Sequence, residues 1–192
     1  QLLPFSNSLY LDGREQKGQA VKVRRQSVGA GIATSVGVVR ALLDVGINRW
    51  DFFRDDTTAA NFVRPPGTFE PTVRLQGEAA LGAVTASLMG EAGWRTDWRA
   101  WGLDGGEAVR PSWQRGRLLV VYEKALFPLA KLHLDAEVWA GHDLDRFSAP
   151  SPSRFGGVHI RGIASGRVLP ERLGVVRVSL ALPLSPTMRA EA

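Results

Sequence analysis

The sequence predicts an all-β fold built from antiparallel strands. Three observations predict it: apolar and polar residues alternate along several stretches, short breaks alternate with long polar connections, and helical spacing fits the same stretches poorly. Alternation is clearest over residues 131–140, where the even positions are apolar and most odd positions are charged or histidine. A period of two residues is that of a strand with one apolar and one polar face.

Further stretches alternate in the same way, namely residues 39–47, 73–79, 85–97 and 176–182. A helix over residues 73–79 would place charged side chains around its whole circumference. A helix over residues 82–91 would be weakened by Gly82 and Gly90, at about 1 kcal/mol each. About eight to ten strands fit into the chain, which is close to the length per strand of a membrane β-barrel.

The connections between these stretches fall into two kinds. Residues 29–31, 80–82 and 126–128 are short breaks that predict tight hairpin turns. Long loops are predicted where Gly, Pro, Ser and charged residues gather, at residues 54–71, 99–115 and 143–154. Tight turns on one rim and long loops on the other are typical of membrane barrels. On this pattern alone, the apolar face could equally contact lipid or a second sheet in a soluble sandwich or barrel.

Composition excludes several classes of protein. The chain has 192 residues, a net charge of +5 and no cysteine, so disulfide scaffolds, thiolate zinc sites and cysteine nucleophiles are excluded. The longest uncharged stretch, residues 26–39, is shorter than the about 18 apolar residues that a membrane helix requires. Because the basic residues are dispersed, we expect no nucleic-acid partner. We expect one domain over residues 1–192, or a fragment of a larger barrel.

No pattern of catalytic residues stands out. His133, His142 and His159 share no ligand spacing, and no Gly-x-Ser-x-Gly motif marks a nucleophile. We therefore expect no enzymatic activity, no metal and no cofactor. Polar faces of the strands are instead expected to line a lumen, through Arg74, Glu78, Glu91, Arg95, Asp135, Glu137 and Arg177.

Five tryptophans lie at the ends of predicted strands or at the bases of loops, namely Trp50, Trp94, Trp98, Trp101 and Trp113. An interfacial aromatic belt would place tryptophans there. Ordinary packing in a core or against a hairpin would do the same. The sequence leaves both interpretations open.

One constellation is more specific. Gly156-Gly157 precedes Ile160-Arg161-Gly162, and an alternating stretch over residues 175–182 ends at Pro183. Residues 131–183 thereby resemble the barrel-closing region of the bacterial surface antigen family, which comprises outer-membrane barrel insertases and two-partner secretion transporters. Ile163 stands where that family carries an aromatic residue.

The resemblance implies an antiparallel transmembrane β-barrel in the bacterial outer membrane that inserts or translocates proteins. Its expected partners are the lipid bilayer and other protein subunits or a client protein. The loop motif Gly156, Gly157, Arg161 and Gly162 would fold back into the lumen, where Arg161 pairs with a carboxylate. Asp135 and Glu137 lie on the polar face and are the expected partners. Two alternatives remain: a porin-like or scaffold barrel subunit of a larger outer-membrane assembly, and a soluble β-barrel or sandwich that binds an apolar ligand or protein.

Overall fold

The computed structural model describes residues 5–7, 10–11, 14–16, 18–127, 130–149, 171–185 and 188–191. The strands are β1 (Phe5–Asn7), β2 (Tyr10–Leu11), β3 (Arg14–Glu15), β4 (Val21–Val36), β5 (Val39–Arg54), β6 (Phe62–Val63), β7 (Thr68–Leu81), β8 (Val84–Trp94), β9 (Gly102–Leu103), β10 (Ser112–Phe127), β11 (Ala130–His142), β12 (Arg172–Ser185) and β13 (Met188–Glu191). Within the described ranges, no helix is long and apolar enough to cross a membrane.

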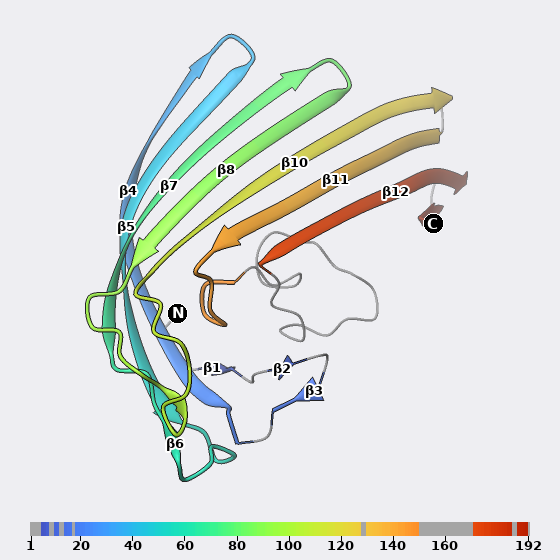
Figure 1. Ribbon diagram of the computed structural model, residues 1–192. Coiled ribbons are helices and arrows are strands. Elements are labelled where there is room, and N and C mark those ends of the chain that lie inside the picture. The colour runs from blue at the N-terminus through green and yellow to red at the C-terminus, as the bar shows by residue number, and fades with distance from the viewer. Residues whose placement is uncertain are drawn as a thin grey trace.

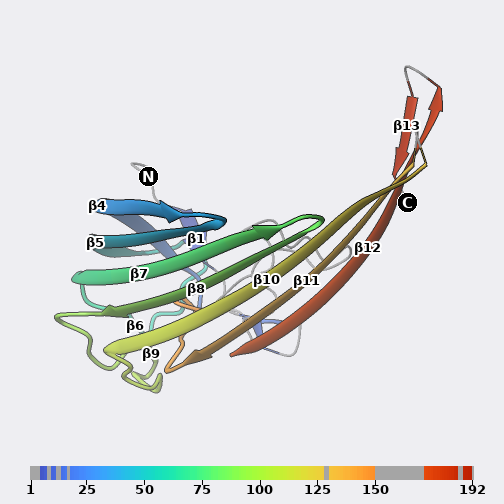
Figure 2. The same cartoon turned by 90° about the horizontal axis from the view of Figure 1, so that it is seen from above.

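Nine of the strands form one antiparallel sheet in the order β1-β4-β5-β7-β8-β10-β11-β12-β13. The sheet curves strongly, as the view from above in Figure 2 also shows, and leaves an open side between β4 and β12 (Figure 1). The prediction of an all-β antiparallel fold is confirmed. The alternating stretches lie in β5, β7, β8, β11 and β12, although β8 ends at Trp94, before the predicted limit at residue 97.

Short and long connections lie at opposite ends of the sheet (Figure 1). A tight turn at residues 82–83 joins β7 to β8, with Gly82 at φ 60°, as residues 80–82 predict. The strand ends at Phe127 and Ala130 agree with the break predicted at 126–128. The long connections are residues 55–67 and 95–111. The first is shorter than predicted because β7 begins earlier, at Thr68. The second has the predicted length but lies four residues nearer the N-terminus, because β8 ends and β10 begins earlier than predicted.

The turn predicted at residues 29–31 is wrong, because these residues lie inside β4. Gly31 is opposite Asp44 of β5, and a Cβ atom on Gly31 would collide with the Asp44 carboxylate. The glycine therefore permits close packing within a strand. The actual turn is at residues 37–38, with Gly37 at φ 57°.

The long strands have an outer and an inner face. On the outer face, large apolar side chains are exposed on every long strand, among them Val28, Ile32, Val36, Val39, Leu43, Val45, Ile47, Phe69, Val73, Leu75, Leu88, Trp94, Leu118, Val138, Val176 and Val178. The registers of neighbouring strands place them on the same side. We call this surface the apolar belt.

The apolar belt carries no Asp, Glu, Lys or Arg. It runs along alternate positions from residue 28 to 36 in β4, 39 to 47 in β5, 69 to 81 in β7, 84 to 94 in β8, 112 to 122 in β10, 132 to 140 in β11 and 174 to 180 in β12. Charged outer-face residues lie beyond it, as with Arg24 and Asp51, which form an ion pair of 3.0 Å near the long connections.

The core lies on the inner face near the long connections. Its largest cluster comprises Val21, Val23, Trp50, Phe52, Phe62, Trp98, Trp101 and Phe147. Trp113 is buried in a second cluster. An aromatic belt of all five tryptophans is therefore wrong, because four of them pack inside. Trp94 alone of the five lies on the outer face, 50% exposed.

Candidate functional site: the polar inner face

The inner face collects the charged side chains that the sequence assigns to a lumen. Six of them occupy inward positions of β7, β8, β11 and β12, and Arg95 directly follows β8. Most of these side chains form ion pairs with a neighbouring strand, whereas Glu78 is exposed. The prediction that the residues share one face is confirmed.

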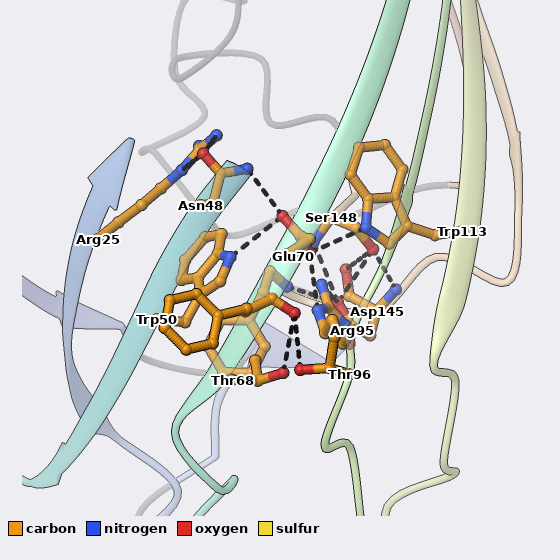
Figure 3. A network of polar contacts seen from close by, with 12 residues as sticks. Arg25, Asn48, Trp50, Thr68, Glu70, Arg95, Thr96, Trp113, Asp145 and Ser148 are labelled. Carbon is orange, nitrogen blue, oxygen red and sulfur yellow. Dashed lines mark hydrogen bonds and ion pairs between the residues drawn. The ribbon is translucent and has the colours of Figure 1, made fainter. Parts of the chain in front are cut away.

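Glu70 is the centre of the network drawn in Figure 3. Its side chain is buried, and its Oε1 accepts hydrogen bonds from Asn48 Nδ2 at 3.2 Å and Trp50 Nε1 at 3.1 Å. Its Oε2 accepts from Arg95 Nε at 2.8 Å and Trp113 Nε1 at 3.0 Å. One carboxylate therefore joins β5, β7 and β10 with the residue that follows β8.

Glu70 is not among the residues that the sequence assigns to the lumen, because the composition of residues 54–71 predicts a loop there. The signal was present: the polar positions of β7 continue backward from Arg74 through Thr72 to Glu70 with the same period of two. Glu70 precedes Pro71, whose outward position lies beside Ile47 in β5. Because β7 stays paired with β5 at this proline, the alternation of inner and outer positions extends to the first residues of β7.

A second ionic cluster lies on β7, β8 and β10. Glu91 accepts from Arg115 Nε at 2.9 Å and Nη2 at 2.5 Å, and from Arg74 Nη2 at 3.1 Å. Glu91 and Arg115 are both buried. A buried carboxylate with two guanidinium partners is held by charge-assisted hydrogen bonds that fix the strands beside one another.

The two carboxylates expected to bind Arg161 have partners of their own. Asp135 accepts from Arg177 Nε at 2.8 Å, and His133 Nε2 lies 3.3 Å from it. Glu137 accepts from Arg117 Nε at 2.6 Å and Trp139 Nε1 at 2.8 Å, but its buried Oε2 has no partner among the described residues. Gly156, Gly157, Arg161 and Gly162 lie outside the described residues, so their pairing stays a prediction.

A segment after β11, residues 144–149, folds against the inner face; we call it the inner segment. Asp145 shapes it locally, because its Oδ1 accepts from the backbone amides of Phe147 and Ser148 at 3.0 Å each. The same carboxylate binds Arg95 Nη1 at 2.5 Å through its Oδ2. Ser148 O accepts from Arg115 at 2.7 Å, which ties the segment to β10.

Apolar contacts hold the inner segment as well. Phe147 packs edge-on against Phe52 at 5.0 Å between ring centroids and against Trp98 at 6.0 Å. Leu144 and Ala149 are buried in the cluster of Trp113. The inner segment therefore occupies part of the concave side of the sheet and binds it through both charge and apolar packing.

Arg146 is the one basic residue of the inner segment, residues 144–149. Its Nη1 donates to Gln19 O at 2.7 Å, whereas its buried Nε and Nη2 have no partner in the described part of the chain. Its guanidinium lies 4.9 Å from the ring centroid of Trp101. Burial lowers the pKa of Arg146 to about 10, and nearby Glu107 and Asp145 oppose this shift.

Ion pairs and hydrogen bonds between neighbouring strands stabilise this polar inner face. Among the described residues, no group of three or more His, Cys, Asp or Glu side chains could hold a metal ion. In each of the ionic clusters described above, an acidic side chain pairs with a basic side chain from another part of the sheet.

Comparison of the sequence and the structure with known protein families, curated proteins and solved structures found no match.

Removing the anchor of the inner segment should release it. We expect Asp145→Ala to increase cleavage by trypsin after Arg146 several-fold, because Arg95 and the backbone amides of the turn lose their acceptor. The matched control is Asp143→Asn, at a half-exposed side chain that lies 3.3 Å from His142. Cleavage kinetics followed by mass spectrometry test this. Equal rates for both variants would show that Asp145 does not hold the segment.

Proposed function

We propose that this chain forms the membrane-spanning wall of a bacterial outer-membrane β-barrel, with the apolar belt facing lipid and the inner face lining a partly filled lumen. The observation that carries the proposal is the uncharged apolar belt, exposed across all long strands, opposite a face of buried ion pairs. Such a surface is far more continuous than the scattered apolar residues of a soluble monomer.

The distribution of polarity argues against a soluble sandwich or ligand-binding barrel. In those folds the apolar side chains face inward and the polar ones face water. Along the apolar belt the order is reversed, with Glu91, Arg115 and Glu137 buried on the concave side and apolar residues exposed on the convex side. The belt positions of β5, residues 39–47, also match the about 9–11 residues of a tilted transmembrane strand.

Trp94 provides a direct test of lipid contact. In vesicles whose acyl chains are brominated, we expect tryptophan emission to be quenched, and most of the quenching to vanish in Trp94→Phe. Trp94 is the half-exposed tryptophan of the outer face, whereas Trp50, Trp98 and Trp101 are buried inside. A chain that remains monomeric in buffer without detergent, with Trp94 quenched by aqueous iodide, would contradict the proposal.

We further propose, on the resemblance of residues 131–183 to the surface antigen family, that the barrel inserts or translocates proteins. The inner segment supports this proposal, because it belongs to the long connection between β11 and β12 and lies against the inner face. The connection would then act as an internal gate held in part by Arg161. A porin-like or scaffold subunit would share the wall without needing this gate.

The contribution of Arg161 can be measured. Arg161→Ala should weaken the folded barrel, seen as loss of heat-modifiable gel mobility at a lower temperature, whereas Arg154→Ala in the same connection should not. The substitution would remove the bond between the Arg161 guanidinium and a lumenal carboxylate, for which Oε2 of Glu137, unpaired among the described residues, is a candidate. Identical melting of both variants would rule out the gate.

A further inference from the structure

Basic side chains gather at one border of the apolar belt, on the outer face of the long strands. Between the belt and the long connections, the outward strand positions carry four lysines or arginines, namely Lys22, Arg24, Arg49 and Arg172. Among the described residues, Asp51 is the one acidic side chain at these positions. The outer face therefore has a surplus of positive charge next to the long connections. We call this surface the basic border.

Arg24 and Arg49 are held side by side in the basic border. Both bind Asp51, since Arg24 donates to its Oδ2 through Nε at 3.2 Å and Nη2 at 3.0 Å, and Arg49 donates to its Oδ1 through Nε at 3.4 Å. The guanidinium of Arg24 lies 5.3 Å from the ring centroid of Phe53, and that of Arg49 lies 5.6 Å from the ring centroid of Phe69. One carboxylate and two aromatic rings thus orient both guanidinium groups.

This pair has hydrogen-bond donors left over. The terminal nitrogens of Arg49, Nη1 and Nη2, have no hydrogen-bond partner among the described residues, and its side chain is 55% exposed. The side chain of Arg24 is 39% exposed. Because two guanidinium groups share one carboxylate, the pair also keeps a net positive charge. A planar guanidinium with two free nitrogens matches the geometry of a phosphate group.

The position of the pair corresponds to the level of lipid headgroups. Val28 and Ile47, the belt residues nearest to it on β4 and β5, lie opposite each other in the register of the two strands. Trp94 marks the same border on β8 and is half-exposed, as tryptophans at a membrane interface are. Since the long loops of outer-membrane barrels are extracellular, this border would belong to the outer leaflet.

We propose that Arg24 and Arg49 bind the phosphate group of an anionic lipid in the outer leaflet, whose acyl chains lie on the apolar belt at Val28 and Ile47. This inference rests on the proposed membrane function. The free nitrogens of Arg49 donate to the phosphate oxygens, while Asp51 keeps the two guanidinium groups together. The acyl chains hold the phosphate at this level of the protein, which free phosphate in solution lacks.

Native mass spectrometry of the full chain in detergent micelles measures the bound lipid. The probe is diphosphoryl lipid A, and its dephosphorylated form serves as the comparison. We expect the double variant Arg24→Gln/Arg49→Gln to bind about tenfold less lipid A, because the charge-assisted bonds to the phosphate are lost. The matched control is Arg99→Gln, at a 77% exposed side chain that binds Asp97 at 2.8 Å. This control should bind lipid A as the unsubstituted chain does.

The single variant Arg49→Gln provides a second test, because it leaves the ion pair of Arg24 with Asp51 in place. It should lose several-fold in lipid A binding while keeping the gel mobility of the folded chain. Equal binding by the double variant and the unsubstituted chain, or equal binding of dephosphorylated lipid A, would overturn the proposal. Displacement of lipid A by an excess of inorganic phosphate would also overturn it. Quenching of Trp94 by brominated lipid, together with any of these results, would reject the phosphate site and leave the membrane function standing.

Discussion

Replacing Glu70 by alanine is expected to lower the free energy of unfolding by about 3–5 kcal/mol, the range for breaking a buried ion pair by removing one partner. The side chain is 1% exposed and accepts from Asn48, Trp50, Arg95 and Trp113. Without it, two indole N–H groups and one amide lose their acceptor in a site closed to water. Arg95 keeps its ion pair with Asp145 and its contact with the ring of Trp98.

The matched control is Glu78→Ala, on the same face of the same strand. Glu78 is exposed, so its removal should change stability by no more than about 0.5 kcal/mol. The free energy of unfolding of Glu70→Gln should lie between those of the two alanine variants. The amide oxygen of the glutamine still accepts hydrogen bonds, whereas its NH₂ group would face other donors. Urea unfolding in detergent micelles, followed by tryptophan emission, measures all three. Equal urea midpoints for Glu70→Ala and Glu78→Ala would show that Glu70 does not hold the network together.

Leu75→Arg is expected to cost about 2–4 kcal/mol of stability in the membrane, the value for an arginine at the lipid-facing midplane of a β-barrel. Leu75 is 61% exposed in the middle of the apolar belt. In a water-soluble protein, the same substitution at so exposed a site would be close to neutral. The variant therefore separates the lipid-facing from the water-facing interpretation of one surface.

The control for this variant is Gln76→Arg, one residue further along β7 and on the inner face. Its added charge would point into the polar lumen and should permit folding into vesicles. Folding yields in lipid vesicles, read from gel mobility without heating, test the pair. Equal yields for the two variants would mean that the belt does not contact lipid.

The period of two predicted the strands and their faces well. Residues 131–140 and 73–79 lie in strands with the predicted sides outward, because alternation is a local consequence of the pleat. Residues 29–31 misled the prediction, since glycine serves both turns and close packing beside a side chain such as Asp44. Because of their prolines, residues 54–71 predict a loop, whereas β7 already begins at Thr68.

The sequence by itself determined an antiparallel all-β chain with one apolar and one charged face, since both follow from which residues alternate. Only the tertiary structure decided that the charged face is concave and that Trp50, Trp98 and Trp101 lie inside. It also placed the inner segment on that face and brought Glu70 to four donors from separate strands. These features depend on curvature and register between residues far apart in the chain, which no local period encodes.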